Sequence, residues 1–384
     1  MPNDVIIEFV TSHDEFFRLE NVWGNLLKKT DVDSPFLTHG WLRAWLTTYG
    51  TGSDILLLLA KFREEVVGIL PFVITKRYGF RILELIGSYR SDWLDLPIMP
   101  QFRENALRAA LSALLNEKIK WDIINFRDIL EDSPLLYKLE SITQDFPMLF
   151  RKKVRTEAPF LPINSTWEEY CKTRSNRFAQ KLRNQKKKLY ETLPAFRIEK
   201  VLNINDENSI IDSMESVEAN SWKATSGNPK LTTRIGKEFY RRICKYFSDL
   251  GCLEIWTATS NDKMIAFALN FIYQNKYYDY NTTFDQRFHK LSPGTILNAE
   301  AVKSSFGSGA YEYDFLSGKE AYKDRWCDKS RKIYQVVLFK QSISSFLAFF
   351  VSIKVRWILK QYPVFVKLNE KFVLLKRRFI RNVR

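Results

Sequence analysis

The sequence has few cysteines and few histidines, and their scarcity excludes two kinds of site. Its four cysteines show no CxxC spacing, and its three histidines, His13, His39 and His289, are far apart in the chain. We therefore expect neither a metal site nor a disulfide framework. Free thiols of this kind are typical of a reducing cytoplasm.

Long apolar runs are also missing. No uninterrupted run reaches about 18 residues, the length that a membrane-spanning helix needs. The first residues, MPNDVIIEFVTSHDEFF, show no basic region followed by an apolar stretch, so we expect no signal peptide. Together these absences predict a cytoplasmic protein.

Positive charge is abundant and unevenly distributed. The chain has 384 residues, 45% of them hydrophobic, which suffices for a large core and two domains. Its net charge is +15, yet residues 171–190 alone contain eight Lys or Arg and no acid, and residues 341–384 contain ten with one acid. The rest of the chain is nearly neutral, so we expect two local contacts with anionic partners.

The hydrophobic pattern predicts an α/β (α+β) fold whose second half repeats the first. Each half shows helices, then a group of strands, a further helix and a last strand or strands. Expected helices lie at 14–29, 34–50, 104–117, 165–189, 209–223, 237–251 and 293–306. Expected strands lie within 54–77, 80–88, 94–100, 121–129, 252–284, 311–318 and 331–340.

These patterns divide the chain into three parts. Residues 1–150 and 151–340 form the two halves, and a capping box of Ser165 and Glu168 opens the basic helix of the second half. Residues 341–384 form a helical tail that Pro363 divides into two pieces, each with a basic face. Such pieces fit helices that lie on an anionic membrane surface, although packing on the body or dimerisation would also suit them.

The segment FHKLSPGTILNAEAVKSSF, residues 288–306, brings a basic run, a Pro-Gly turn and a helix start together. A helix N-terminus carries unpaired N–H groups and a partial positive charge, so it can bind an anion. The alternative is an ordinary loop followed by an ordinary cap.

Four segments of the sequence resemble parts of a known bacterial family, and they follow one another along the chain in the order that the family shows. The run SPGTILNAEAVKSSFGSGAYEYDFLSGKEAYKDRWCD at 292–328 resembles the closing motif of the GNAT-type acyltransferases called CelD/BcsL-like or BioF2-like. The segments VEANSWKATSG, RSNRFAQKLRNQKKKLYE and VVGILPFVI resemble other parts of the same family. The resemblance implies two tandem GNAT-like halves, as in the FemAB group, each with a mixed, mostly antiparallel sheet flanked by helices. It also implies a link to surface polysaccharides.

The resemblance further implies that acetyl-CoA, or another acyl-CoA, binds in the second half. The loop that would hold its diphosphate has one glycine here, where the family form Q/R-x-x-G-x-G/A has more, and Pro293 removes a donor. The residues expected to bind the cofactor are Arg287, Lys290, Ser292, Gly294 and Thr295.

Acyl transfer to an amine or hydroxyl needs a base and a proton donor for the leaving thiolate. Glu218, on a helix with Trp222 four residues later, and Asp279, among aromatics in KYYDYNTT, are the expected bases. Tyr322 is the expected acid. Each residue also has a structural interpretation. Glu218 could be a solvated carboxylate, Asp279 could occupy an exposed strand position, and Tyr322 could pack in the core.

The acceptor is expected to be a small-molecule or lipid-linked sugar. The basic helix could bind a diphosphate-linked substrate or RNA, or it could be a solvated face. Asp314 could bind substrate or instead hydrogen-bond a turn, and Lys323 could bind an anion. The expected substrate-binding residues are Arg177, Lys181, Trp222, Lys223, Asp314 and Lys323.

The leading hypothesis is therefore an acyltransferase that moves an acetyl group from CoA to a sugar or surface-polysaccharide precursor. A second hypothesis is FemAB-like transfer of an amino acid from a charged tRNA, for which the basic helix would bind the tRNA. A third is a non-catalytic, membrane-tethered assembly factor, which the single-glycine cofactor loop motivates.

Overall fold

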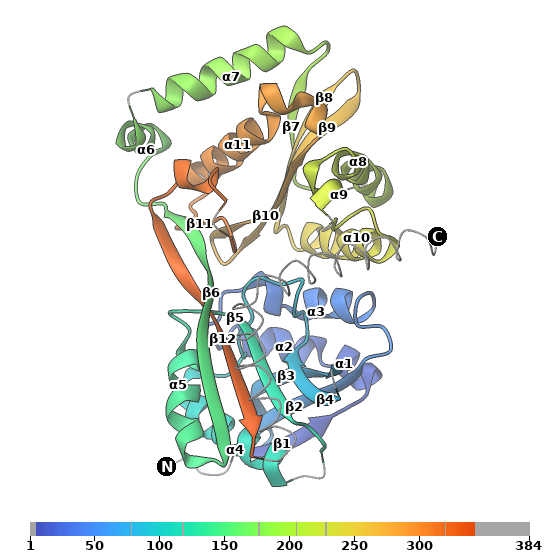
Figure 1. The fold of residues 1–384 in the computed structure, drawn as a ribbon, viewed down its shortest axis with the longest axis vertical. Coiled ribbons are helices and arrows are strands. Elements are labelled where there is room, and N and C mark those ends of the chain that lie inside the picture. Colours follow the sequence, from blue (N-terminus) through green and yellow to red (C-terminus); the bar gives the residue numbers. More distant parts are fainter. Residues whose placement is uncertain are drawn as a thin grey trace, which may run out of the picture.

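The computed structural model describes residues 5–77, 79–116, 119–175, 177–204, 206–226, 229–318 and 320–341. Twelve strands form one sheet in the order β1-β2-β3-β4-β5-β12-β6-β11-β10-β9-β8-β7 (Figure 1). The predicted tail, residues 341–384, lies outside the described residues from 342 onward. None of the described helices combines the length and hydropathy needed to cross a bilayer.

The first half contains five strands and five α-helices among its described residues. The strands are β1 (Val5–Val10), β2 (Asp54–Phe62), β3 (Glu65–Arg77), β4 (Phe80–Leu85) and β5 (Ile123–Leu130). The helices are α1 (His13–Arg18), α2 (Glu20–Leu27), α3 (His39–Leu46), α4 (Arg103–Asn116) and α5 (Pro134–Ile142).

The second half adds the remaining strands and helices. The strands are β6 (Met148–Pro162), β7 (Arg197–Val201), β8 (Leu253–Ser260), β9 (Lys263–Tyr273), β10 (Lys276–Phe284), β11 (Glu312–Asp314) and β12 (Lys329–Lys340). The helices are α6 (Trp167–Arg174), α7 (Phe178–Thr192), α8 (Glu207–Ala219), α9 (Trp222–Ser226), α10 (Arg234–Asp249) and α11 (Pro293–Gly307). The predicted division at residue 150 falls within β6.

The strand order reads the same from either edge toward the centre, which confirms the predicted mixed sheet. In each half one pair of neighbouring strands is parallel: β4 pairs with β5, and β10 pairs with β11. The other pairings are antiparallel, and the long strands β12 and β6 join the halves at the centre. Such repetition is what two tandem GNAT-like halves require.

The two halves share one hydrophobic core. Trp41 of α3 is fully buried and contacts the rings of Phe239 (centroids 5.3 Å apart), Phe271 (5.7 Å) and Tyr280 (5.2 Å) across the boundary. Buried aromatic contact of this size is favourable, so the halves are held in a defined relative position. In the second half, α11 covers one face of the sheet and α8 and α10 cover the other (Figure 1).

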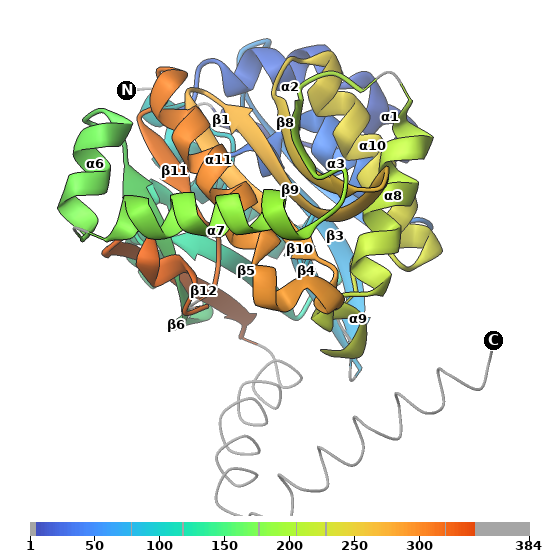
Figure 2. The same cartoon turned by 90° about the horizontal axis from the view of Figure 1, so that it is seen from above.

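The basic segment differs from the prediction in two details. The capping box is formed by Thr166 and Glu169, one residue later than predicted, because Thr166 is extended and Trp167 is the first helical residue. The predicted single helix is two helices, α6 and α7, since Ser175 is extended and Arg177 caps the second. Seen from above, α7 crosses the outside of the second half (Figure 2).

The parallel strand pair ends differently in the two halves. In the first half, residues 86–99 run beside β5, where Leu94 N–H donates to the carbonyl of Asp128, and they bury Trp93, Leu94 and Leu96. In the second half, β10 pairs with β11 from Lys276 to Tyr278, and no described strand pairs with that side of β10 from there to Phe284. The end of this short parallel pair positions the site described next.

Candidate active site

A cavity of about 710 Å³ lies where β10 and β11 diverge. Seven of the predicted site residues line it: Trp222, Lys223, Asp279, Gly294, Thr295, Tyr322 and Lys323. These residues come from α9, β10, the first turn of α11 and the segment after β11. The first half supplies Asp92 from the 86–99 segment, so both halves form the wall.

A β-bulge in β10 shapes this cavity. The register of β10 against β9 shifts between Asp279 and Asn281, immediately beyond the residues that pair with β11. A bulge bends a strand and re-aims its side chains, and bulges are frequent beside active sites. The bulge and the end of the β11 pairing therefore coincide at Asp279.

Asp279 is a buried carboxylate with incomplete hydrogen bonding. It is 6% exposed, and Oδ2 has no hydrogen-bond partner among the residues that the structure describes. The Thr282 hydroxyl lies 3.0 Å from Asp279 Oδ1 and 2.7 Å from Asn298 Oδ1, and its one proton can serve only one of them at a time. Burial raises the pKa of Asp279 to about 6, although Lys323, Thr282 and Lys223 oppose the increase. A carboxylate with this pKa can accept a proton near neutral pH.

Tyr322 supplies a phenol to the same cavity. Burial raises its pKa well above the usual value, so the hydroxyl keeps its proton at neutral pH. The side chain is half-buried and follows β11 in the segment that closes the cavity. A protonated phenol beside a buried carboxylate provides a proton donor and a proton acceptor in one space.

The ammonium of Lys323 is held by the chain itself. It donates to the carbonyls of Leu316 (3.3 Å), Ser317 (3.1 Å) and Gly318 (3.4 Å), and it pairs with Glu320 at 2.8 Å. These contacts use its donors and fix the turn after β11. Anion binding by Lys323 therefore stays a prediction.

Lys223 connects α9 to β10 beyond the bulge. Its ammonium donates to Asn281 Oδ1 (2.5 Å), Thr282 O (2.8 Å) and Thr283 Oγ1 (2.7 Å). Burial and the nearby charge of Lys230 lower its pKa to about 7, while the carboxylates of Glu218 and Asp279 oppose the decrease. Its neighbour Trp222 is 52% exposed and also lines the cavity.

Glu218 does not line the cavity but holds part of its wall. The side chain is fully buried, and Oε2 accepts hydrogen bonds from the backbone N–H groups of Lys230 (2.8 Å), Leu231 (2.5 Å) and Thr232 (3.3 Å). This arrangement fixes the segment that brings Lys230 to the cavity. Glu218 was predicted to act as a base, but its side chain is not among the residues that line the cavity.

The predicted cofactor loop reaches the cavity only at its end. Helix α11 begins at Pro293 after Ser292, whose φ is 52°, and Gly294 and Thr295 of its first turn line the cavity. A Cβ on Gly294 would lie 3.0 Å from the Phe284 ring, so glycine lets the helix approach β10 closely. The Arg287 guanidinium is bound to Asp285 and, like Lys290, is exposed outside the cavity.

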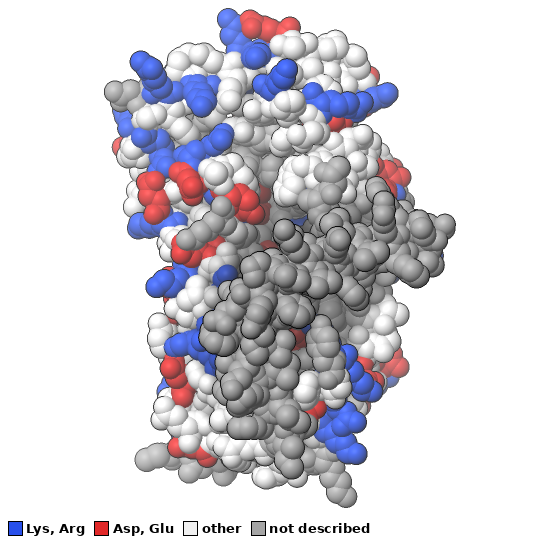
Figure 3. All heavy atoms as spheres, in the orientation of Figure 1, with Lys and Arg blue, Asp and Glu red and all other residues white. Residues whose placement is uncertain are grey.

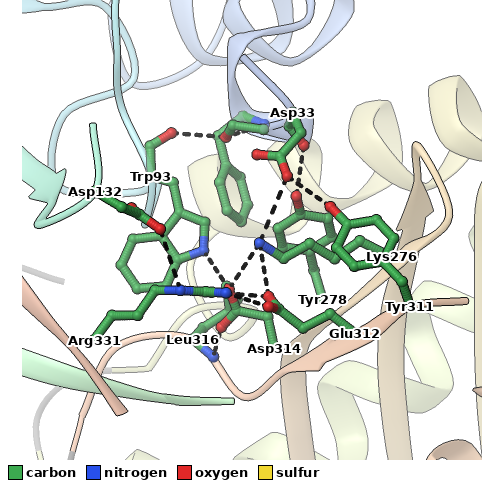
Figure 4. Close-up of polar contacts among 12 residues, drawn as sticks. Asp33, Trp93, Asp132, Lys276, Tyr278, Tyr311, Glu312, Asp314, Leu316 and Arg331 are labelled. Carbon is green, nitrogen blue, oxygen red and sulfur yellow. Dashed lines mark hydrogen bonds and ion pairs between the residues drawn. The ribbon is translucent and has the colours of Figure 1, made fainter. Parts of the chain in front are cut away.

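Asp314 faces the boundary between the halves rather than the cavity. Figure 4 shows Lys276 and Arg331 directed toward Asp314 and Glu312, while Trp93 reaches in from the first half. Asp314 Oδ2 accepts from Trp93 Nε1 at 2.9 Å and lies 3.4 Å from Lys276 Nζ, and Oδ1 accepts from Leu316 N–H at 2.8 Å. Burial raises the pKa of Asp314, although Lys276 opposes the increase. Asp314 thus fixes the start of the turn that leads to Lys323.

Arg177 and Lys181 lie away from this cavity, at the start of α7. Figure 1 shows α7 at the end of the molecule opposite the first half, and Figure 3 shows Lys and Arg side chains gathered at that end. A second cavity, of about 640 Å³, is lined by residues of α6, α7 and α11. The basic helix therefore forms a surface separate from the Asp279 cavity.

The cavity residues that were not predicted from the sequence include Lys230 and Asp92. Lys230 belongs to the polar loop ATSGNPKLTT, and Asp92 belongs to the other half. Neither residue has a periodic pattern around it. The acidic partner that fixes the Lys230 segment lies 12 residues earlier, on α8.

Residues 176–324 match the family model described as "Acetyltransferase (GNAT) domain". The second half therefore carries a GNAT-type acetyltransferase domain, as the resemblance predicted. A comparison with curated proteins gives no match.

Solved structures share this fold over nearly the whole described chain. FemX has a TM-score of 0.60 at 11% identity, covering 86% of this chain and 96% of its own. The C-terminal domain (DUF2156) of a protein assigned as a lysylphosphatidylglycerol synthetase from Agrobacterium fabrum has a TM-score of 0.55 at 11% identity, covering 87% and 95%. L-PGS from Bacillus licheniformis gives 0.51 at 9% identity, with the same coverage of 87% and 95%. At these identities the likeness is one of fold.

Proposed function

We propose that the protein transfers an acetyl group from acetyl-CoA to an amino or hydroxyl group of a sugar or surface-polysaccharide precursor. The observation that carries the proposal is the buried Asp279 carboxylate at the divergence of β10 and β11, in a cavity that Tyr322 also lines. The narrower assignment to CelD/BcsL-like enzymes belongs to the same proposal. It rests on the sequence segments quoted above.

The donor would bind between β10 and the first turn of α11. Beyond Tyr278 the β11 side of β10 has no strand partner among the described residues, so backbone groups there suit the amides of a pantetheine arm. The positive end of the α11 dipole, at Gly294 and Thr295, suits the diphosphate. Acyl-CoA would supply the activated thioester.

The reaction needs no covalent enzyme intermediate. The acceptor nitrogen or oxygen bonds to the thioester carbonyl carbon, and Asp279 takes the proton that the acceptor loses. The C–S bond then breaks, and the departing thiolate takes the phenolic proton of Tyr322, which solvent restores. Holding both substrates in one cavity supplies a large part of the rate by proximity.

The direct test measures thiol release from acetyl-CoA in the presence of amino sugars and nucleotide-linked sugars. We expect release above background with at least one acceptor, together with an acceptor product heavier by one acetyl group. We expect Asp279→Asn to slow both by about 10²-fold or more. Equal release by the wild type and this variant would contradict the proposal.

A second proposal is transfer of an amino acid from a charged tRNA, which two observations favour. One is the likeness in fold to FemX and to the A. fabrum protein, whose assignment is that of a lysylphosphatidylglycerol synthetase. The other is the exposed basic surface of α7, which would suit a tRNA backbone. Filter binding with charged tRNA distinguishes the acetyl-CoA proposal from the tRNA proposal. Only the tRNA proposal predicts that the protein binds charged tRNA and that Lys181→Glu and Lys188→Glu weaken this binding.

A further inference from the structure

Lys230 is a cavity residue whose ammonium has no hydrogen-bonding or ion-pair partner among the described residues. This ammonium lies 4.8 Å from the centroid of the Tyr280 ring. The side chain is half-buried and lines the same cavity as Asp279. A partly buried ammonium with unused donors is costly unless another group pairs with it.

The other two lysines of the cavity differ in this respect. Lys223 donates to three acceptors on β10, and Lys323 donates to three carbonyls and pairs with Glu320. Asp92 accepts a hydrogen bond from the Ser317 hydroxyl at 2.5 Å. Of the three lining lysines, only Lys230 keeps its donors unused among the described residues.

The segment that carries Lys230 is built to hold it there. Glu218, a fully buried carboxylate, accepts three backbone N–H groups from residues 230–232. On the other side, a Cβ on Gly236 would lie 1.8 Å from the Lys230 carbonyl oxygen, so α10 packs directly against this segment. Two independent constraints therefore fix the position of the Lys230 backbone beside the cavity.

The charges around Lys230 are mixed, with cations from both halves. Burial lowers the pKa of Lys230, Asp92 and Glu218 oppose the decrease, and Arg90 and Lys323 add to it. Arg90 lies in the first half, with its guanidinium 4.2 Å from the Tyr49 ring centroid. An anionic ligand at this position would relieve the repulsion between the cations and use the free donors.

We propose that the acceptor carries a phosphate group that binds the Lys230 ammonium at the side of the cavity facing the first half. This inference rests on the proposed acyl transfer, because that proposal is what makes the ligand at Lys230 the acceptor. An ammonium binds phosphate as a point charge with rotatable donors, whereas planar carboxylates are better matched by the fork of an arginine. The phosphate could come from a nucleotide-linked sugar or from a lipid-linked sugar.

Isothermal titration of the CoA-saturated protein tests this inference, since bound CoA occupies the donor's own phosphate positions. The probes are UDP for the nucleotide source, farnesyl phosphate for the lipid source, and benzoate as a carboxylate. We expect one phosphate probe to bind the wild type and to bind Lys230→Met at least about tenfold more weakly, a difference of about 1.4 kcal/mol. Which probe binds identifies the source.

Two further variants control for charge and folding. Lys263→Met removes an exposed lysine at the start of β9 and should bind like the wild type, while Lys230→Arg keeps the charge and should retain part of the affinity. Equal binding by Lys230→Met, absence of phosphate binding by the wild type, or equally tight binding of benzoate would overturn the inference.

A separate titration with acetyl-CoA distinguishes failure of this inference from failure of the proposed function. Lys230→Met should bind acetyl-CoA as the wild type does. If the wild type does not bind acetyl-CoA, the proposed function fails. Lys230-dependent phosphate binding, measured then on the free protein, would still stand.

Discussion

The indole of Trp93 donates a hydrogen bond to the Asp314 carboxylate across 221 residues of sequence, at 2.9 Å. Trp93 belongs to the segment that packs beside β5 in the first half, and Asp314 ends β11 where the second half opens into the cavity. The same carboxylate accepts the Leu316 N–H, and the Leu316 carbonyl accepts from Lys323. The boundary between the halves is thus connected to the turn that lines the cavity.

Trp93→Phe should destabilise the protein and also slow the reaction. Loss of the indole N–H removes a hydrogen bond to a buried carboxylate, which costs about 1–3 kcal/mol, measured by urea unfolding. Trp121→Phe is the matched control, because Trp121 is buried in the first half and donates to the Leu114 carbonyl. That control should lose stability while keeping the wild-type kcat per folded molecule. Identical kcat for both variants would refute a connection from Trp93 to the cavity.

Asp279→Asn should lower kcat/KM for acyl transfer by about 10²–10⁴-fold, the usual contribution of a general base. Because burial raises the pKa of Asp279 to about 6, the wild-type rate should rise with pH through about 6 as the carboxylate ionises. Asp279→Asn should lose this rise and keep its affinity for acetyl-CoA. An unchanged pH profile in the variant would assign the base to another group.

The same carboxylate should make the folded protein less stable as pH rises, whereas it makes the reaction faster. Its folded pKa lies above the unfolded value of about 3.9, so its protonated form favours folding below about pH 4, and this contribution is lost as pH rises through about 6. The stability difference between Asp279→Asn and the wild type should therefore grow from pH 4 to pH 7. Thermal unfolding across this range measures it, and a constant difference would show that the pKa is not raised. Asp95, whose pKa is also near 6, is present in both proteins and cancels.

Glu218→Gln should weaken acceptor binding more than catalysis. Glu218 acts through the backbone of residues 230–232, so the variant loses charge-assisted hydrogen bonds that position Lys230. We expect KM for the acceptor to increase severalfold with little change in kcat. Glu215→Gln, on the same helix and paired with Lys237 near the surface, should leave both values unchanged. A drop in kcat with constant KM would instead indicate direct participation of Glu218 in proton transfer.

Local patterns in the sequence predicted the elements and much of the cavity. Apolar runs located β2 and β3, and the Ser292-Pro293-Gly294 turn located the start of α11. The resemblance brought Asp279, Tyr322 and Lys223 into one expected site, and the structure places all three around one cavity. These residues lie in or near the ends of helices and strands, where short sequence motifs indicate the local structure.

Contacts between distant segments could not be predicted in the same way. Nothing near Glu218 shows that it accepts three backbone N–H groups, and nothing near Asp314 shows that its partners are Trp93 and Lys276. Asp92 and Lys230 reach the cavity through loops whose paths depend on packing between the halves. The break between α6 and α7 was also missed, since the cationic run 172–188 has helical composition throughout.

Titration of acetyl-CoA into the wild type and Gly294→Ala tests the central claim most directly. A methyl group on Gly294 would press on the Phe284 ring at the α11 start, whereas one on Gly307, at the far end of the same helix, meets nothing within 4 Å. The account predicts binding by the wild type and by Gly307→Ala, with Gly294→Ala at least about tenfold weaker. No binding by the wild type at millimolar acetyl-CoA, or equal binding by all three proteins, would contradict it.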